Sequence, residues 1–176
     1  YINSNVLVIQ ELITLFKKNK FKLFLNLSTI SVYEKNLSGV IHEKSKKNKN
    51  NILAITKIFG ENLVKNSNIN YLNLRLPSVI DFKKNNYNWI NNIHLKFLKN
   101  KTIKLLNPNN KINSIVDTIE ISKIVDFLLI NKKFKLKKTV NFMPENKISI
   151  IKIVNLIKLN LNSNSKISYN YKPFKQ

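Results

Sequence analysis

The chain has 176 residues, of which 43% are hydrophobic, so it is long enough to fold around a buried core. It carries 31 basic and 9 acidic residues, a formal net charge of +22, and Arg75 is its only arginine. Specific recognition of phosphates and bases favours the planar guanidinium of arginine over the lysine ammonium. The abundance of Lys, Asn and Ile is typical of an AT-rich genome, so we expect no specific nucleic-acid partner.

Several other classes of protein are disfavoured by composition. The absence of cysteine excludes disulfides and thiolate chemistry, and His42 and His94 are isolated, so we expect no metal site. No apolar run approaches the roughly 20 residues of a membrane helix, so we expect no membrane partner. The absence of cysteine is compatible with an intracellular protein, and the localisation we expect is cytoplasmic. Because no methionine opens the chain and Tyr1 leads directly into a helical pattern, we expect that the beginning of a longer protein is missing.

The predicted elements alternate between helix and strand. Apolar residues recur at helical spacing from Val6 to Phe16, and the apolar run Phe21–Leu27 predicts a strand buried on both faces. The order predicts an α/β fold with parallel strands joined by right-handed crossovers. The later elements are a loop at 35–50, helix 52–65, strand 71–76, loop 81–88, helix 89–98, strand 103–106, a turn at 107–110, a strand entrance at 114–116, helix 119–131 capped by Asp117 or Thr118, strand 140–143, helix 148–159 and strand 166–169.

Two stretches carry most of the information about function. The sequence NLSTISVYE (Asn26–Glu34) ends a predicted strand in a Ser/Thr turn followed by Val-Tyr. The sequence NILAITKIFGENLVKN (Asn51–Asn66) is a predicted helix with Lys57, Gly60 and Glu61 in its interior. Both stretches lie at the point where strand, turn and helix meet in an α/β unit.

Further short motifs follow these two in a fixed order. They are Leu-Arg-Leu-Pro at Leu74–Pro77, the stretch Asn113–Glu120, and Val140–Met143. Together the motifs resemble the extended short-chain dehydrogenase/reductases, the NAD-dependent epimerase/dehydratase family, in the middle and C-terminal part of their chain. The resemblance implies the C-terminal part of a Rossmann-type parallel sheet, with a partial small substrate-binding subdomain.

The resemblance also implies catalytic positions. In the family, a hydroxyl at the Thr29 position hydrogen-bonds the substrate, while a tyrosine exchanges a proton as hydride moves to or from the nicotinamide. A lysine four residues on, here Lys57, lowers the phenol pKa and holds the cofactor ribose. The tyrosine position is Leu53, which has no proton to exchange. Tyr33 is an alternative source of a phenol, although it belongs to a different element.

Other positions follow from the same resemblance. Pro77 is expected to contact the cofactor, and Ser78, Asp81 and Asn113 to contact the substrate, a nucleotide-sugar-like molecule. The family usually has Gly at the Asp81 position and, at the Asn113 position, an arginine that meets the diphosphate. No glycine-rich phosphate loop is present, so NAD or NADP is expected in the complete protein, without tight binding to this chain alone.

Domains and activity are predicted on this basis. Residues 1–80 and 113–143 are expected to form the Rossmann-type domain, whose glycine-loop half is absent, and residues 81–112 and 144–176 the partial substrate-binding subdomain. The family further implies a homodimer through helices 6–16 and 52–64. The function expected is that of a fragment or degenerate sugar-nucleotide epimerase, dehydratase or reductase, inactive by itself; the alternative is a non-catalytic binding or assembly protein.

Overall fold

The computed structural model describes residues 1–34, 40–81 and 88–171. They belong to two compact units, described one at a time below. Unit 1 is Tyr1–Pro77 with Ile121–Phe142, and unit 2 is Ser78–Glu120 with Met143–Gln176. No helix in the described part of the chain is both long enough and apolar enough to cross a membrane.

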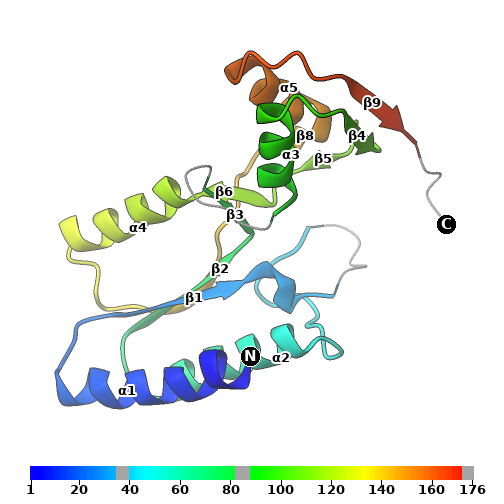
Figure 1. Ribbon diagram of the computed structural model, residues 1–176. Coiled ribbons are helices and arrows are strands. Elements are labelled where there is room, and N and C mark those ends of the chain that lie inside the picture. The colour runs from blue at the N-terminus through cyan, green and yellow to red at the C-terminus, as the bar shows by residue number, and fades with distance from the viewer. Residues whose placement is uncertain (35–39, 82–87, 172–176) are drawn as a thin grey trace. The chain divides into compact units, whose positions relative to one another are not determined.

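Unit 1 is built on a parallel sheet with the strand order β1-β2-β7 (Figure 1). The strands are β1 (Phe24–Thr29), β2 (Tyr71–Leu76) and β7 (Lys137–Asn141). All six residues of the central strand β2 are buried, as expected of a strand flanked on both sides and covered on both faces. The predicted α/β class with parallel strands is therefore confirmed.

Helices cover both faces of this sheet. A π-helical turn at Asn3–Leu7 leads into α1 (Val8–Lys18), which lies beside α2 (Ile52–Asn66) on one face, and α4 (Thr118–Ile130) lies on the other (Figure 1). The side chain of Asn51 caps α2 by accepting from the Ala54 N–H. Asp117 caps α4 by accepting from the Ile119 N–H at 2.8 Å, as predicted.

The helices α1 and α2 approach each other closely at Gly60. A Cβ at Gly60 would lie 2.5 Å from the Asn5 carbonyl oxygen and 2.7 Å from Ile9 Cδ1, so only glycine fits there. Beside this contact, the Asn5 amide donates to Thr56 Oγ1 at 3.1 Å in a buried setting. The same helices share a core with the sheet, which consists of Ile9, Ile13, Phe16, Val64, Ile69 and Tyr71.

The described residues of unit 2 form three strand pairs and two helices. Its core contains Ile93, Phe97, Ile103, Leu105 and Val154. The elements are β3 (Ser78–Ile80) parallel to β6 (Ile115–Asp117), β4 (Ile103–Leu106) parallel to β9 (Ile167–Asn170), β5 (Lys111–Ile112) antiparallel to β8 (Ile148–Ser149), and helices α3 (Trp89–Leu98) and α5 (Ile150–Asn160).

Helix ends explain where the first strand differs from its prediction. After α1, Lys20 adopts φ 53°, and the N–H groups of Lys20 and Phe21 donate back to the carbonyls of Lys17 and Phe16. This Schellman motif turns the chain, so Phe21 is exposed and β1 begins only at Phe24. The left-handed position usually holds glycine. In this chain it holds Lys or Asn after four helices: Lys20, Asn100, Lys132 and Asn162.

Replacing Gly60 tests the close contact between α1 and α2. We expect Gly60→Ala to lower the free energy of unfolding by about 1–3 kcal/mol, because the added methyl collides with backbone that cannot yield cheaply. Asn62→Ala is the control, since Asn62 is exposed in the same helix and alanine is the better helix former. Urea unfolding followed by circular dichroism measures both; equal stability of the two variants would contradict this account.

Candidate functional site

The carboxyl end of β1 carries the first predicted catalytic residue. Thr29 is the last residue of β1, and its Oγ1 accepts a hydrogen bond from the Ser31 N–H at 3.1 Å. This bond caps a short 3₁₀ turn, Ile30–Val32, that leads to Tyr33. The hydroxyl of Thr29 therefore still has its proton to donate to another group.

Lys57 reaches the same strand from α2. Its Nζ donates to the Leu27 carbonyl at 3.1 Å, two residues before Thr29. Burial lowers the pKa of the Lys57 ammonium, and the charge of Glu61 opposes this shift. Leu53 lies one helical turn before Lys57 and lines a hollow together with Ile30, Ser31 and Tyr33, among others. The three predicted catalytic positions are thus grouped within unit 1, although their roles stay predictions.

Tyr33 is committed to a structural position. Its side chain is 3% exposed, its hydroxyl donates to Asn141 Oδ1 at 2.6 Å, and it accepts from Arg75 Nη1 at 2.7 Å. Burial raises the pKa of this phenol although Arg75 acts in the opposite direction. A buried phenol with both hydrogen-bonding roles filled is poorly suited to exchange a proton with a substrate.

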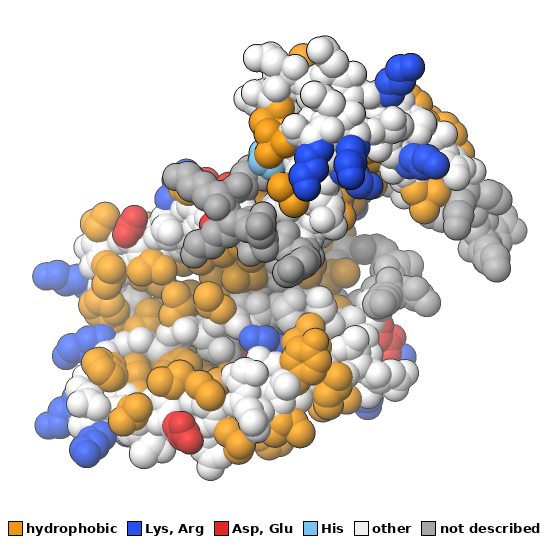
Figure 2. Space-filling view, viewed as in Figure 1, with side chains coloured by type: hydrophobic (Ala, Val, Ile, Leu, Met, Phe, Trp, Pro, Cys, Tyr) orange, Lys and Arg blue, Asp and Glu red, His pale blue; other side chains and the backbone are white. Residues whose placement is uncertain are grey.

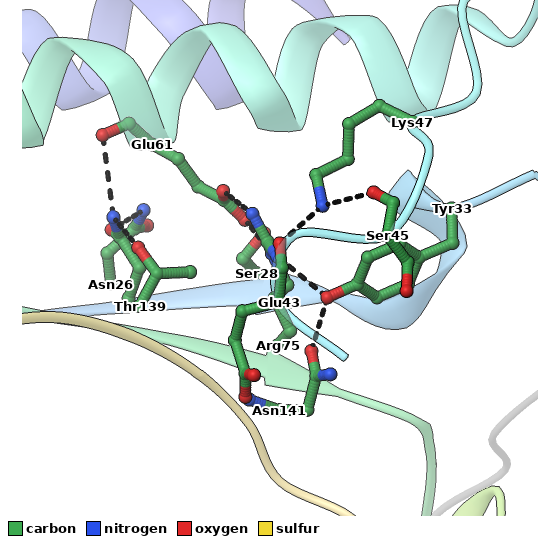
Figure 3. Close-up of polar contacts among 11 residues, drawn as sticks. Asn26, Ser28, Tyr33, Glu43, Ser45, Lys47, Glu61, Arg75, Thr139 and Asn141 are labelled. Atoms are coloured by element: carbon green, nitrogen blue, oxygen red, sulfur yellow. Dashed lines mark hydrogen bonds and ion pairs between the residues drawn. The ribbon is translucent and has the colours of Figure 1, made fainter. Parts of the chain in front are cut away.

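A buried ion pair lies beneath these residues (Figure 3). Arg75 Nε donates to Glu61 Oε1 at 2.9 Å and Nη2 to Oε2 at 2.6 Å, which is the bidentate geometry that guanidinium and carboxylate favour. Ser28 of β1 donates to the same carboxylate at 2.5 Å. Burial alone would lower the pKa of Arg75, but the hydrogen bonds and charge of Glu61 raise it.

The loop before α2 is attached to this pair. Arg75 Nη1 donates to the Glu43 carbonyl at 3.0 Å, and the Glu43 carboxylate accepts from the Asn141 N–H at 2.8 Å, which lowers its pKa. Lys47 Nζ lies 4.1 Å from the centroid of the Tyr33 ring and donates to the Glu43 and Ser45 carbonyls. Burial, followed by the charge of Arg75, lowers the pKa of Lys47 to about 8.

A row of amides continues the polar network across the sheet (Figure 3). Asn26 of β1 donates to Asn73 of β2 at 2.8 Å, and Asn73 donates to Thr139 of β7 at 3.1 Å. Asn73 also donates to the Glu61 carbonyl at 3.4 Å. These bonds link all three strands beneath α2, so the polar groups on this face of the sheet are satisfied rather than free for chemistry.

The remaining predicted site residues lie at or after the end of β2. Pro77 is buried directly after β2 in unit 1. In unit 2, the Ser78 N–H donates to the Ser114 carbonyl at 3.0 Å, which places Ser78 beside the residue that follows Asn113. The amide of Asn113 donates to the Pro144 carbonyl at 3.1 Å, and the Asp81 carbonyl accepts from Asn91 at 3.1 Å. Their assignment to cofactor and substrate stays a prediction.

Comparison with known proteins settles the family. The profile of the NAD dependent epimerase/dehydratase family matches residues 1–141. The chain belongs to this family. None of the curated proteins compared with it is significantly similar in sequence. The predicted family is therefore confirmed.

Solved structures of epimerases have the same fold as this family member. UDP-glucuronic acid 4-epimerase from Bacillus cereus in complex with NAD superposes with a TM-score of 0.80 at 20% identity, over 97% of this chain and 57% of its own. UDP-N-acetylglucosamine 4-epimerase from Methanobrevibacter ruminantium M1, in complex with UDP-N-acetylmuramic acid, gives 0.80 at 17% identity, over 100% and 58%. The chain thus spans somewhat more than half the length of these epimerases.

The ion pair of this family member was missed at the level of sequence. In the sequence, Glu61 stands out only as part of a motif, and Arg75 only as the single arginine and as part of the Leu-Arg-Leu-Pro motif. The sequence does contain a signal for it. Lysine supplies the other basic residues of the chain, so an arginine inside an apolar strand indicates a position that needs the bidentate guanidinium. No group of three His, Cys, Asp or Glu side chains suited to a metal occurs in the portion of the chain that the structure describes.

A double-mutant cycle tests the buried pair. We expect Arg75→Met and Glu61→Leu to lower the free energy of unfolding by about 3–5 kcal/mol each, because each leaves an uncompensated buried charge. The double variant should be less destabilised than the sum of the two, since neither charge remains. Arg75→Lys should also be strongly destabilised, because an ammonium cannot donate in bidentate fashion. Additive costs in urea unfolding would show that the pair is not a unit.

Proposed function

We propose that this chain is a fragment or degenerate copy of an NAD(P)-dependent enzyme that epimerises, dehydrates or reduces the sugar of a nucleotide sugar, with an impaired proton-transfer step. The observation that carries the proposal is the side chain of Leu53, which lies against the turn that follows Thr29, one helical turn from Lys57. The related structures in complex with NAD and with a UDP-sugar compound support the substrate class.

The chemistry explains why this position matters. When hydride leaves a sugar carbon, the hydroxyl on that carbon must lose its proton, so the site needs a group that accepts it. The Thr29 hydroxyl can hydrogen-bond the reacting oxygen and the Lys57 ammonium can favour a neighbouring anion, but the Leu53 side chain accepts nothing. With Tyr33 held by Arg75 and Asn141, no phenol among the described residues of the site takes over.

The residues of this chain suit the nicotinamide end of a dinucleotide better than its pyrophosphate. Bound NAD or NADP would supply the hydride acceptor. Lys57 of α2, whose Nζ reaches the Leu27 carbonyl near the carboxyl end of β1, is suited to hold the ribose next to the nicotinamide. The chain has only two glycines, and Gly60 lies under Asn5 in the interior of α2, so nothing here forms a glycine-rich cradle for the pyrophosphate. We therefore expect no tight cofactor binding by this chain alone.

The substrate end is assigned to Ser78, Asp81 and Asn113. Asn113 offers an amide where an arginine would make two charge-assisted bonds to a diphosphate, so we expect weaker binding of that group. Lys111 of β5 adds positive charge nearby, but only as a flexible point charge. The sugar itself is not identified by these residues.

Restoring the phenol tests the proposal. In Leu53→Tyr we expect the introduced hydroxyl to titrate below its ordinary pKa of about 10, because the Lys57 ammonium one turn away favours the phenolate. Ultraviolet absorbance of the phenolate against pH measures this, with Leu53→Phe subtracted as the matched control. Adding Lys57→Met should raise the pKa of the introduced phenol again. An introduced phenol that titrates normally with or without Lys57 would contradict the proposed geometry.

The alternative function is that of a non-catalytic binding or assembly protein. The feature that favours it is the apolar surface of the two helices predicted to form a homodimer, where Leu12, Leu15, Ile55 and Phe59 are each more than two-fifths exposed. Two such helices from each of two copies can bury these side chains in a four-helix contact. This assembly requires no catalytic group and therefore tolerates Leu53.

A matched pair of variants tests the dimer. Phe59 on α2 and Phe127 on α4 are both 53% exposed. We expect Phe59→Glu to shift the chain from dimer to monomer, because two carboxylates would be buried in the contact, whereas Phe127→Glu leaves the mass unchanged. Light scattering coupled to size-exclusion chromatography measures the mass. A monomeric wild type, or equal effects of both variants, would count against the dimer.

A further inference from the structure

The loops at the amino end of the unit 1 sheet carry the motif Lys-Phe-Lys twice. It occurs at Lys20–Lys22, between α1 and β1, and at Lys133–Lys135, between α4 and β7. Because β1, β2 and β7 are parallel, their amino ends lie at one edge of the sheet, opposite the edge that carries Thr29. Two triplets far apart in the sequence are thereby brought to the same end of the unit.

Both triplets line one hollow of about 720 Å³ at this end of the sheet. Backbone hydrogen bonds fix the segments that form it. The Phe24 N–H donates to the Asn70 carbonyl at 2.9 Å, and this holds the start of β1 against the segment before β2. The Tyr71 N–H donates to the Leu136 carbonyl at 2.7 Å, which holds the segment before β7 in the same way. The volume is in the range of sites that hold small ligands, so the hollow accommodates a short piece of a longer molecule.

The walls of this hollow are strongly basic. Five lysines line it, and none of the described residues around it is acidic. None of the five forms an ion pair with a carboxylate that the structure describes. Figure 2 shows basic side chains at the end of unit 1 where α1 and α4 end. An anion that enters the hollow therefore meets several cations at once and no competing carboxylate, which is the arrangement that attracts a ligand with more than one negative charge.

Two phenylalanines give the basic hollow a second property. Phe21 is 60% exposed, because the Schellman motif after α1 turns the chain there, and its ring lies in a tilted contact with Phe16 at a centroid distance of 5.8 Å. Phe134 of the other triplet is half-buried. An aromatic ring exposed to water is unfavourable by itself. Between lysines, however, it is a platform on which a nucleic-acid base can stack while the phosphates meet the ammonium groups.

Charge and aromatic surface together indicate one class of ligand. A duplex presents phosphates but keeps its bases stacked inside, and an acidic peptide or inorganic polyphosphate carries charge without bases. A lipid surface is flat and would contact only the rim of a hollow. A single strand offers phosphates and unstacked bases together. The single arginine of the chain argues against reading a base sequence, but stacking and lysine contacts to phosphates require no sequence.

We propose that this hollow is a binding site for single-stranded nucleic acid, which is held without sequence preference by stacking on Phe21 and Phe134 and by phosphate contacts with the lysines around them. The site lies at the opposite end of the sheet from Thr29 and from the Leu27 carbonyl that Lys57 binds. The proposal therefore does not depend on the proposed enzymatic function.

Matched lysine variants test the charge. The probe is a fluorescein-labelled strand of about twelve thymidylates, and fluorescence anisotropy measures its Kd over a range of salt concentrations. The double variant Lys22→Gln/Lys135→Gln is compared with Lys44→Gln/Lys49→Gln, which removes the same charge from exposed positions outside the hollow. We expect the first to weaken binding about tenfold and to lower the salt slope by about 1.4, roughly 0.7 for each lost phosphate contact. Equal effects of the two double variants would show that net charge alone acts, and the proposal would fail.

Phenylalanine variants test the stacking. We expect Phe21→Leu to weaken binding of the thymidylate strand about tenfold, and to leave the affinity for inorganic polyphosphate, measured by competition, unchanged, because polyphosphate has no base to stack. Phe59→Leu is the control, since Phe59 is 53% exposed on α2 and does not line the hollow. Phe134→Leu provides the same test if circular dichroism shows that Phe21→Leu does not fold.

Three results would overturn the proposal. The first is unchanged strand binding in folded Phe21→Leu and Phe134→Leu variants. The second is an equal loss of strand and polyphosphate binding in either variant, because the site would then recognise charge alone. The third is competition by thymidine monophosphate, or by a duplex of the same length, as strong as that of the unlabelled single strand, because the site would then belong to free nucleotides or to duplexes.

Discussion

The bidentate contact between Arg75 and Glu61 is the interaction on which unit 1 depends. It joins the central strand to α2, and through Ser28, Tyr33 and the Glu43 carbonyl it also positions β1, the turn after it and the loop before α2. Two ions removed from water cost several kcal/mol each, so the pair is tolerable only because nearly every lone pair and N–H is satisfied. The network gives these elements one arrangement instead of several.

The catalytic position and its support differ in kind. On the proposed function, Leu53 replaces a tyrosine. As an apolar side chain in a helix that needs apolar residues, it leaves packing almost undisturbed. Arg75 and Glu61 cannot change separately without leaving a buried charge unpaired. On the same proposal, a chain under weak selection for turnover keeps the ion pair and loses the phenol.

The sequence was sufficient for the parts governed by local pattern. The strand Tyr71–Leu76 and the helix Trp89–Leu98 have the predicted bounds, because the apolar pattern marks both and Pro77 ends the strand. The family motifs also predicted the end of β1, near which the Lys57 side chain binds the strand. What the sequence could not show depends on pairing across long separations, such as Tyr33 with Asn141, since nothing local announces that a phenol is already engaged.

The left-handed helix ends have a consequence for how this protein can change. A side chain held at positive φ costs about 1–2 kcal/mol relative to glycine, and Lys20, Asn100, Lys132 and Asn162 all occupy such positions. The fold thus retains an unused reserve of stability at these four helix ends. Glycine at two or three of them would offset the cost of a destabilising substitution elsewhere, so the chain could accept a costly change without first redesigning its core.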